Sequence, residues 1–417
     1  MNHMFTVRIL NLKFSPNLGD GVVAECLETL LKKHIPDIDI GTVDLSARDS
    51  FGASGSVGGK KLSLMTRLKS LPKPVHDFTI FYGIRFAILA IIGNKKWSPL
   101  LKDSDTVVIG GGHLLSDVDY YFPIRIWTAL SQIKPRTTVH LYAVGIAGGW
   151  SARALRLCKS AFRRVDLQSV AARDVQSMTN WTAQFKDPAP SLARDPGILA
   201  IDVYNVQSNL KPTRHADIKG AKTALGVSDM GDLTAHANGG TVVGGSIAFY
   251  LSLCRELVKD GTAVTLFTNG APDDMLYMDN IRSIVEKDSG LQGKVKFLPR
   301  VLTSTALVKW IATQDLLIAH RLHANIIAYS CGVPHIGLGW DPKLKSFFNS
   351  VGRDDFIISM DVANPRIIPD LAARSVREGI DEDRHKKVLD ETRATIANLA
   401  AIILKCKKAK QRDLKSY

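Results

Sequence analysis

Arg321 and His323 combine a permanent cation with a side chain that transfers protons, and they stand two positions apart. A guanidinium binds phosphate and carboxylate oxygens in pairs, and an unperturbed imidazole titrates with a pKa of about 6.5. These residues separate an apolar run of strand length, 316–319, from a second apolar run, 324–329. This order of strand, polar turn and helix predicts a βαβ unit, whose rim binds ligands. The unpaired N–H groups at the helix start would also attract a phosphate or a carboxylate.

Polar residues or glycines end several other predicted strands, which is where α/β proteins bind their ligands. They are Asn17, Gly19 and Asp20 after strand 5–10, Gly110, Gly111 and Gly112 at the end of strand 105–112, Arg173 and Asp174 after strand 169–173, and Asp341 and Lys343 after strand 335–338.

Each of these candidates also has a purely structural interpretation. The three glycines would let another element pack closely, and His113 after them is interpreted as structural. Asp20 would cap the helix that follows it. Arg173 and Asp174 would form a salt bridge with a helix cap. Arg321 and His323 have a structural interpretation as well, in which they only cap a buried helix.

Strand and helix patterns alternate through nearly the whole chain, and 417 residues are too many for one domain. We therefore expect an α/β protein with two doubly wound, Rossmann-like domains of GT-B-like type that face each other across a cleft. The expected parts are an N-terminal domain at 1–205, a linker at 206–220, a C-terminal domain at 221–382, and an amphipathic helix with a basic tail at 383–417. The apolar stripe of that helix is Val388, Thr392, Ile396, Leu399 and Ile403.

The formal net charge of +14 favours an anionic partner: nucleic acid, an acidic membrane surface or a phosphorylated substrate. Because the basic residues are dispersed and no nucleic-acid-binding motif accompanies them, we expect no nucleic acid. Five scattered cysteines without CxxC spacing argue against a disulfide framework and a zinc site. The N-terminus has no signal-peptide pattern, so we expect a cytoplasmic protein.

The longest apolar run, 78–92, is shorter than the roughly 20 residues of a membrane-spanning helix, and Arg85 lies in its middle. We expect a buried or half-buried helix there. The alternative is a helix that dips into the membrane surface and, with the basic tail, holds the protein at its inner face. The glycine-rich stretch 46–73 lacks the spacing of a phosphate loop and predicts a mobile loop that covers a substrate.

Five of these places, taken in chain order, resemble the signature of the polysaccharide pyruvyltransferase family. They are Asn17-x-Gly19-Asp20, Gly110-Gly111-Gly112, Arg173-Asp174, Arg321-x-His323 and Lys343. The resemblance implies a ketal pyruvyltransferase that moves pyruvate from phosphoenolpyruvate onto two hydroxyls of a sugar in exopolysaccharide or cell-surface glycan biosynthesis. Phosphoenolpyruvate would be a substrate, and we expect neither a cofactor nor a metal. The N-terminal domain would hold the acceptor and the C-terminal domain the donor.

The roles follow from the donor, which carries a phosphate and a carboxylate and needs a proton at C3 when an alcohol adds to C2. The cations suited to its two anions are Arg173, Arg321 and Lys343. His323 would protonate C3 or the departing phosphate, and Asp20 or Asp174 would take a proton from the attacking hydroxyl. The resemblance assigns Asn17, Gly19, Gly110, Gly111 and Gly112 to substrate binding.

Two other functions stay open. A glycosyltransferase with the same two-domain shape would bind a nucleotide sugar at the same helix start. A non-catalytic protein would bind an anionic glycan or membrane through its positive charge alone. The acceptor, whether a sugar or a lipid-linked oligosaccharide, and the oligomeric state stay open as well.

Overall fold

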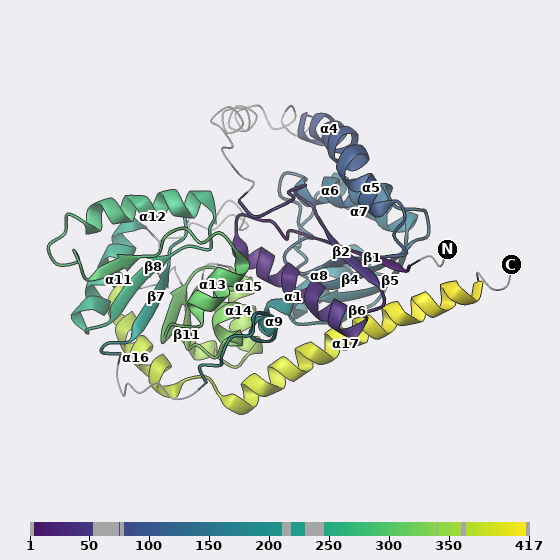
Figure 1. Cartoon of the computed structure of the whole chain (residues 1–417). Coiled ribbons are helices and arrows are strands. Elements are labelled where there is room, and N and C mark those ends of the chain that lie inside the picture. Colours follow the sequence, from purple (N-terminus) through teal and green to yellow (C-terminus); the bar gives the residue numbers. More distant parts are fainter. Residues whose placement is uncertain are drawn as a thin grey trace. The chain divides into compact units, whose positions relative to one another are not determined.

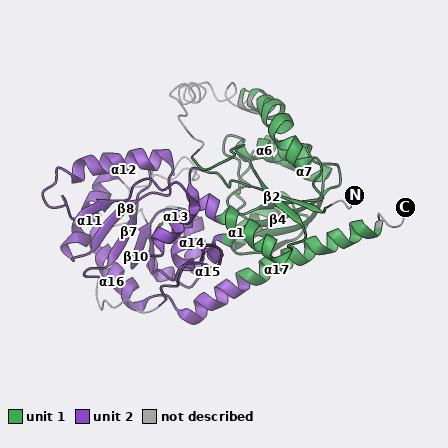
Figure 2. Cartoon of the chain, viewed as in Figure 1, with its two compact units in different colours: residues 1–15, 23–196, 392–417 green, residues 16–22, 197–391 purple. Residues whose placement is uncertain are grey.

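The computed structural model describes residues 4–52, 75, 79–210, 218–229, 246–339, 341–359 and 364–413 (Figure 1). Its strands form two six-stranded sheets in which all neighbouring strands are parallel. The chain divides into two compact units, which are coloured separately in Figure 2. Unit 1 is residues 1–15, 23–196 and 392–417, and unit 2 is residues 16–22 and 197–391. The fold is therefore α/β with two Rossmann-like sheets, as the sequence predicted.

The sheet of unit 1 has the strand order β2-β1-β3-β4-β5-β6. Its strands are β1 (Thr6–Asn11), β2 (Asp39–Asp44), β3 (Thr106–Gly110), β4 (Thr138–Val144), β5 (Asp166–Ala172) and β6 (Pro190–Leu192). The helices that follow these strands are α1 (Leu18–His34), α6 (Tyr121–Ser131), α7 (Ala152–Arg164) and α8 (Val175–Gln184). Strand β3 is buried along its whole length, because helices cover both faces of a parallel sheet.

The sheet of unit 2 has the strand order β12-β11-β10-β7-β8-β9. Its strands are β7 (Lys222–Gly226), β8 (Ala263–Phe267), β9 (Val295–Phe297), β10 (Leu316–Ala319), β11 (His335–Gly339) and β12 (Ile357–Ser359). The helices are α9 (Ala200–Tyr204), α11 (Ile247–Lys259), α12 (Pro272–Val285), α13 (Ser304–Ile311), α14 (Leu322–Ser330), α15 (Pro342–Ser350) and α16 (Ile368–Glu378). Counted from β7 as the first strand, this is the Rossmann order, and the chain changes direction across the sheet between β7 and β10.

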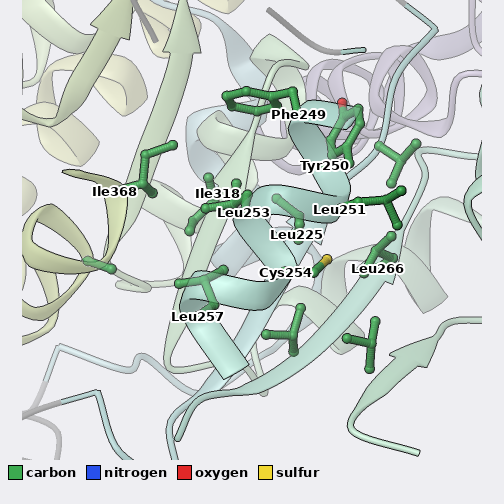
Figure 3. Close-up of a cluster of buried hydrophobic side chains, with 14 of the residues drawn as sticks. Leu225, Phe249, Tyr250, Leu251, Leu253, Cys254, Leu257, Leu266, Ile318 and Ile368 are labelled. Carbon is green, nitrogen blue, oxygen red and sulfur yellow. The ribbon is translucent and has the colours of Figure 1, made fainter. Parts of the chain in front are cut away.

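The core of unit 2 forms where α11 packs on the sheet (Figure 3). Leu253 and Leu257 of α11 are fully buried and meet aliphatic side chains from the strands, Leu225, Leu266 and Ile318 among them. Ser246 caps this helix by accepting a hydrogen bond from Phe249 N at 3.2 Å. The cap and the apolar face together fix α11, and through it the strand ends that carry the candidate site.

The start of α1 differs from its prediction. The helix begins at Leu18, so Asp20 lies in its first turn and does not cap it. The side chain of Asn17 accepts from Gly19 N at 3.4 Å instead, which is the capping position. The apolar spacing that located the helix began only at Val22, because Leu18 is followed by three residues, 19–21, that are polar or small. The carboxylate of Asp20 is thereby available for another contact.

The apolar run 78–92 forms part of a continuous helical segment in unit 1, and its described part starts at Thr79. The segment consists of η1 (Thr79–Ile84) and η2 (Ile88–Trp97), which are π-helical, with α4 (Arg85–Ala87) between them and α5 (Ser98–Leu101) after them. Phe81, Ile88 and Trp97 are buried against unit 1, which confirms a half-buried helix. Among the described helices, none combines the length and the apolar composition needed to cross a bilayer.

The C-terminal helix α17 (Glu382–Asp413) is as long as the sequence indicated, and the predicted apolar stripe is buried. Residues 392–413 belong to unit 1, where Thr395 Oγ1 lies 2.8 Å from the hydroxyl of Tyr142. The units assign residues 16–22 and 197–205 to unit 2, whereas the sequence placed them in the N-terminal domain. Residues 53–73 of the predicted loop and residues 211–217 of the predicted linker lie outside the described residues.

Candidate active site

Arg321 lies in unit 2 at the carboxyl end of β10, beside the point where the strand order reverses. Its guanidinium is bound by the carboxylate of Asp274, at the start of α12. The Nε donates to Oδ2 at 3.0 Å, and Nη2 donates to Oδ1 at 2.8 Å and to Oδ2 at 2.7 Å. Asp274 is 0% exposed and also accepts from Asp229 N at 2.9 Å. The ion pair with Asp274 therefore fixes the position of the Arg321 cation and the plane of its guanidinium.

Asp274 was not among the residues that sequence patterns selected, although it stands after β8 as Arg321 stands after β10. Its partner is 47 positions away in the chain, and only the strand order brings the two loops together. An acid at the start of a predicted helix was the available signal. Acids in a first helical turn are so common that this signal alone does not indicate a site.

His323 and Asp20, both predicted site residues, lie together in unit 2. His323 Nδ1 is 3.2 Å from Asp20 Oδ1, and both side chains are mostly buried. A Cβ atom on Gly19 would overlap His323 Cβ and lie 3.0 Å from its Nδ1, so only glycine lets the two segments approach this closely. A carboxylate that accepts from one ring nitrogen sets the orientation of an imidazole and leaves the other nitrogen for proton transfer.

The first turn of α14 carries both Arg321 and His323. Arg321 occupies the position before the helix, and its side chain makes no capping hydrogen bond. Asn325 is fully buried, and its Nδ2 donates to the carbonyl oxygens of Ala319 at 3.1 Å and Arg321 at 3.0 Å. Asn325 thus fixes the turn between strand and helix through carbonyl oxygens, and this side-chain nitrogen does not occupy the N–H groups at the start of α14. Such a helix start, beside a held guanidinium, suits an anionic ligand.

Two fully buried polar side chains support this strand edge. His320 Nδ1 lies 3.2 Å from the carbonyl oxygen of Leu338, and burial lowers the pKa of His320 to about 3. The hydroxyl of Tyr250 accepts from Ser228 N at 3.0 Å, and burial raises the pKa of Tyr250 well above its ordinary value. Both groups are uncharged at pH 7, so neither competes with Arg321 for an anion.

Lys343 stands after β11, the strand next to β10. Asp341 caps α15 by accepting from Lys343 N at 2.7 Å, and its other oxygen lies 3.1 Å from Lys343 Nζ. The lysine side chain is half-buried. Lys343 is thus a cation on the same edge of the unit 2 sheet as Arg321, and it has a carboxylate partner in this structure.

Arg173 and Asp174 lie in unit 1, at the carboxyl end of β5. Asp174 caps α8 by accepting from Ser177 N at 2.7 Å, as the structural interpretation predicted. Arg173 lies 3.7 Å from Asp174 and 3.7 Å from Asp195, an acid that the sequence patterns did not select. The Arg173 side chain is 7% exposed, and its Nη2 has no hydrogen-bond partner among the described residues. That nitrogen is a buried donor suited to a ligand oxygen.

His113 and Arg173 converge above Gly145. A Cβ atom on Gly145 would lie 2.5 Å from His113 Nδ1 and 2.9 Å from Arg173 Nη2. Gly145 N also donates to the carbonyl oxygen of Gly112 at 2.8 Å, which joins the loops after β3 and β4. His113 therefore lies beside Arg173, and its structural interpretation from sequence is not tested by this arrangement.

The three glycines after β3 have different environments. A Cβ on Gly110 would lie 2.7 Å from Leu27 Cδ2, and one on Gly111 would overlap Val23 Cγ1. Gly111 also has a φ of +75°, which side chains rarely adopt. The role that the structure gives Gly110 and Gly111 is close packing against α1. A Cβ on Gly112 would meet nothing within 4 Å, so Gly112 is the one of the three with room for a ligand.

The predicted site residues therefore fall into two groups. Unit 2 holds Asn17, Gly19, Asp20, Arg321, His323 and Lys343, and unit 1 holds Gly110, Gly111, Gly112, Arg173 and Asp174. Within the part of the chain that the structure describes, no group of three or more histidines, cysteines or acids is arranged to hold a metal ion.

Comparisons with known proteins concern both the family and the fold. The model of the family polysaccharide pyruvyl transferase matches residues 17–342. A comparison with curated proteins gave no match. Among solved structures, UDP-N-acetylglucosamine 2-epimerase from Rickettsia bellii is similar with a TM-score of 0.52 at 12% identity, covering 98% of this chain and 97% of that one.

A second similar structure is that of S. aureus MnaA with UDP, with a TM-score of 0.50 at 10% identity, covering 93% of this chain and 95% of that one. At such low identity, these two likenesses establish the fold, a GT-B-type pair of Rossmann-like sheets, and nothing about the ligand.

Proposed function

Because the chain belongs to the polysaccharide pyruvyl transferase family, a family of transferase enzymes, we propose that its donor is phosphoenolpyruvate and its acceptor a sugar with two reacting hydroxyls. The product would be a pyruvate ketal on an exopolysaccharide or another surface glycan. The observation that best supports this proposal is the first turn of α14. There a guanidinium held by a buried carboxylate stands two residues from an imidazole that faces Asp20. Family membership also removes the non-catalytic alternative.

The reaction determines which groups are needed. Two sugar hydroxyls add to C2 of phosphoenolpyruvate, the bond from C2 to the phosphate oxygen breaks, and inorganic phosphate leaves. One hydroxyl proton ends on C3, which becomes a methyl group, and the other is released with the phosphate. The enzyme must therefore bind two anions, deliver a proton to carbon and accept protons from hydroxyls.

We assign donor binding to two of the predicted cations, Arg321 and Lys343 of unit 2, and acceptor binding to the third, Arg173 of unit 1. Arg321 and Lys343 stand on one edge of the unit 2 sheet, beside the uncapped start of α14, which favours the phosphate. Arg173 of unit 1 carries the buried donor Nη2, which favours an oxygen of the sugar acceptor. Asp274 does not touch the donor in this proposal. It positions Arg321, so that little conformational entropy is lost when the donor binds.

We assign proton transfer to His323 and Asp20. His323 in its protonated form would deliver the proton to C3, and Asp20 would hold the ring and stabilise its charge. The imidazole left after this step can accept a proton from one attacking hydroxyl, and the proton of the other hydroxyl would leave with the phosphate. Of the two carboxylates that the sequence predicted, Asp20 takes part through its contact with His323, whereas Asp174 caps α8 and faces Arg173.

A nucleotide sugar is the second candidate donor. The observation in its favour is that the first turn of α14 is as well suited to a diphosphate as to a single phosphate. The S. aureus structure of the same fold contains UDP. Fold likeness without sequence similarity gives this donor less weight than the family does.

Thermal unfolding with each donor tests the proposal. Phosphoenolpyruvate at a hundred times its dissociation constant should stabilise the parent by about 2.7 kcal/mol. Arg321→Ala should lose this shift, measured against its own unliganded midpoint because Asp274 is left unpaired. The matched control is Arg366→Ala, which removes an exposed arginine of unit 2 and should keep the shift. A shift with a nucleotide sugar and none with phosphoenolpyruvate would contradict the proposal.

A further inference from the structure

The helical segment 79–101 of unit 1 carries large apolar side chains on its outward face. Tyr82 is 50% exposed, Phe86 73% and Ile91 60%. In a π-helix, where hydrogen bonds join residues five apart, a side chain returns to the same face after four or five positions. Tyr82, Phe86, Ile91 and Lys95 follow that spacing. The inward face is apolar too, with Phe81, Ile88 and Trp97 buried, so this segment is hydrophobic on both sides.

A helix that is apolar all round is normally buried, and surface helices of globular proteins normally turn a polar face to water. Three large apolar side chains in register on one exposed face therefore indicate a binding surface. We call Tyr82, Phe86 and Ile91 the apolar face.

Positive charge surrounds the apolar face. Residues 78–102 contain four basic residues and no acidic one, and α7 contains five basic residues and no acidic one. Arg153 of α7 lies 5.1 Å from the ring centre of Phe81 and 5.9 Å from that of Tyr82, which places α7 beside the face. Lys95 and Arg156 are exposed.

Two of the acids near this surface are engaged by the protein. Asp49 binds Lys96 at 3.0 Å, and Asp117 accepts from Ser151 N at 2.8 Å. An apolar face with a basic rim and few available acids matches the interface of an anionic bilayer, where apolar side chains enter the acyl boundary and cations meet phosphates.

We propose that the apolar face and its basic rim, Lys95, Arg153 and Arg156, dock the enzyme on the surface of an anionic lipid bilayer. The segment would lie in the plane of the interface. The sequence left open a helix in the run 78–92 that dips into the membrane surface, and this proposal names the residues that would make the contact. Vesicle binding requires neither the donor nor the acceptor proposed above, so the two proposals can fail independently.

Vesicle flotation with the full chain tests this docking surface. Vesicles of phosphatidylglycerol and phosphatidylcholine in equal parts should carry the parent upward, and vesicles of phosphatidylcholine alone should not. Phe86→Ser with Ile91→Ser should weaken binding by about tenfold or more, because both side chains would lose apolar burial. The matched control is Leu276→Ser, which removes a side chain that is 65% exposed on α12 and should float like the parent.

The basic rim is tested separately. Lys95→Glu with Arg156→Glu should abolish flotation at low salt, and Lys259→Glu with Lys309→Glu, the same charge change on exposed positions of unit 2, should not. Failure of the parent to bind anionic vesicles would overturn the proposal. Equal vesicle binding by the rim variant and the unit 2 control variant would also overturn it. A third contrary result would be a parent that is an oligomer and that the Phe86 and Ile91 changes convert to monomers without affecting vesicle binding. Circular dichroism confirms that each variant is folded.

Discussion

Asp274→Asn removes one charge from the fully buried side of the Arg321 pair and tests whether that pair organises the site. Removing one partner of a buried ion pair costs about 3–5 kcal/mol. We take the lower value, about 3 kcal/mol, because the Arg321 side chain is 17% exposed and water can partly solvate it. At about 2–4 °C per kcal/mol for a unit of this size, the unfolding midpoint should fall by roughly 6–12 °C.

Donor binding should weaken in the same variant. Without the carboxylate, the guanidinium of Arg321 is no longer held in one plane and must be ordered by the ligand itself. The loss of one oriented, charge-assisted hydrogen bond should raise the dissociation constant for phosphoenolpyruvate by about tenfold or more. Differential scanning calorimetry measures the first effect, and isothermal titration calorimetry with phosphoenolpyruvate measures the second.

Asp273→Asn is the control, because it makes the same change one position earlier in α12, where the residue is exposed. The double variant Asp274→Asn with Arg321→Gln should lose less stability than the sum of the single changes, since it leaves no buried charge without a partner. If Asp274→Asn unfolds at the same midpoint as Asp273→Asn and binds the donor like the parent, the pair does not organise the site.

Two further predictions concern Gly19 and His320. Gly19→Ala should destabilise the protein by about 1–3 kcal/mol and reduce turnover, because the new methyl group displaces His323. Thermal unfolding measures the first effect and phosphate release the second. The control is Gly83→Ala, where a Cβ meets nothing within 4 Å, and it should change neither stability nor turnover. Burial lowers the pKa of His320 to about 3, whereas the unfolded chain has the ordinary histidine pKa of about 6.5. Between these two pH values the unfolded chain binds a proton at His320 and the folded chain does not. Stability should therefore fall with pH in that window, and His320→Gln should reduce the slope by up to about 1.4 kcal/mol per pH unit, measured by urea unfolding across the window; an unchanged slope would show that His320 is not buried in its neutral form.

Local patterns were sufficient for the elements that carry the site. The run 316–319 is strand β10 over the predicted residues, and the stripe from Val388 to Ile403 is the buried face of α17. Both depend on the period of apolar residues within one segment, which the sequence contains directly. The π-helical geometry of 79–97 does not follow from such a period, because a short apolar run fits several helix types.

Contacts between distant segments could not be predicted from the period of apolar residues within one segment. Asp274 binds Arg321 because the strand order sets β8 and β10 on either side of β7, and no spacing in the sequence encodes that order. Asp195 beside Arg173 is a similar case. Gly19 was predicted as a ligand contact, and its approach to His323 shows that a glycine in a signature can be required by packing against a neighbouring site residue.

Unit 2 is not a continuous stretch of sequence, since it includes residues 16–22 as well as 197–391. The short stretch supplies Gly19 and Asp20 to His323. A chimeric enzyme made by joining two relatives at residue 197 would therefore inherit the imidazole from one parent and its carboxylate from the other. Exchange of unit 2 between members of the family should succeed only when the first turn of α1 is exchanged with it.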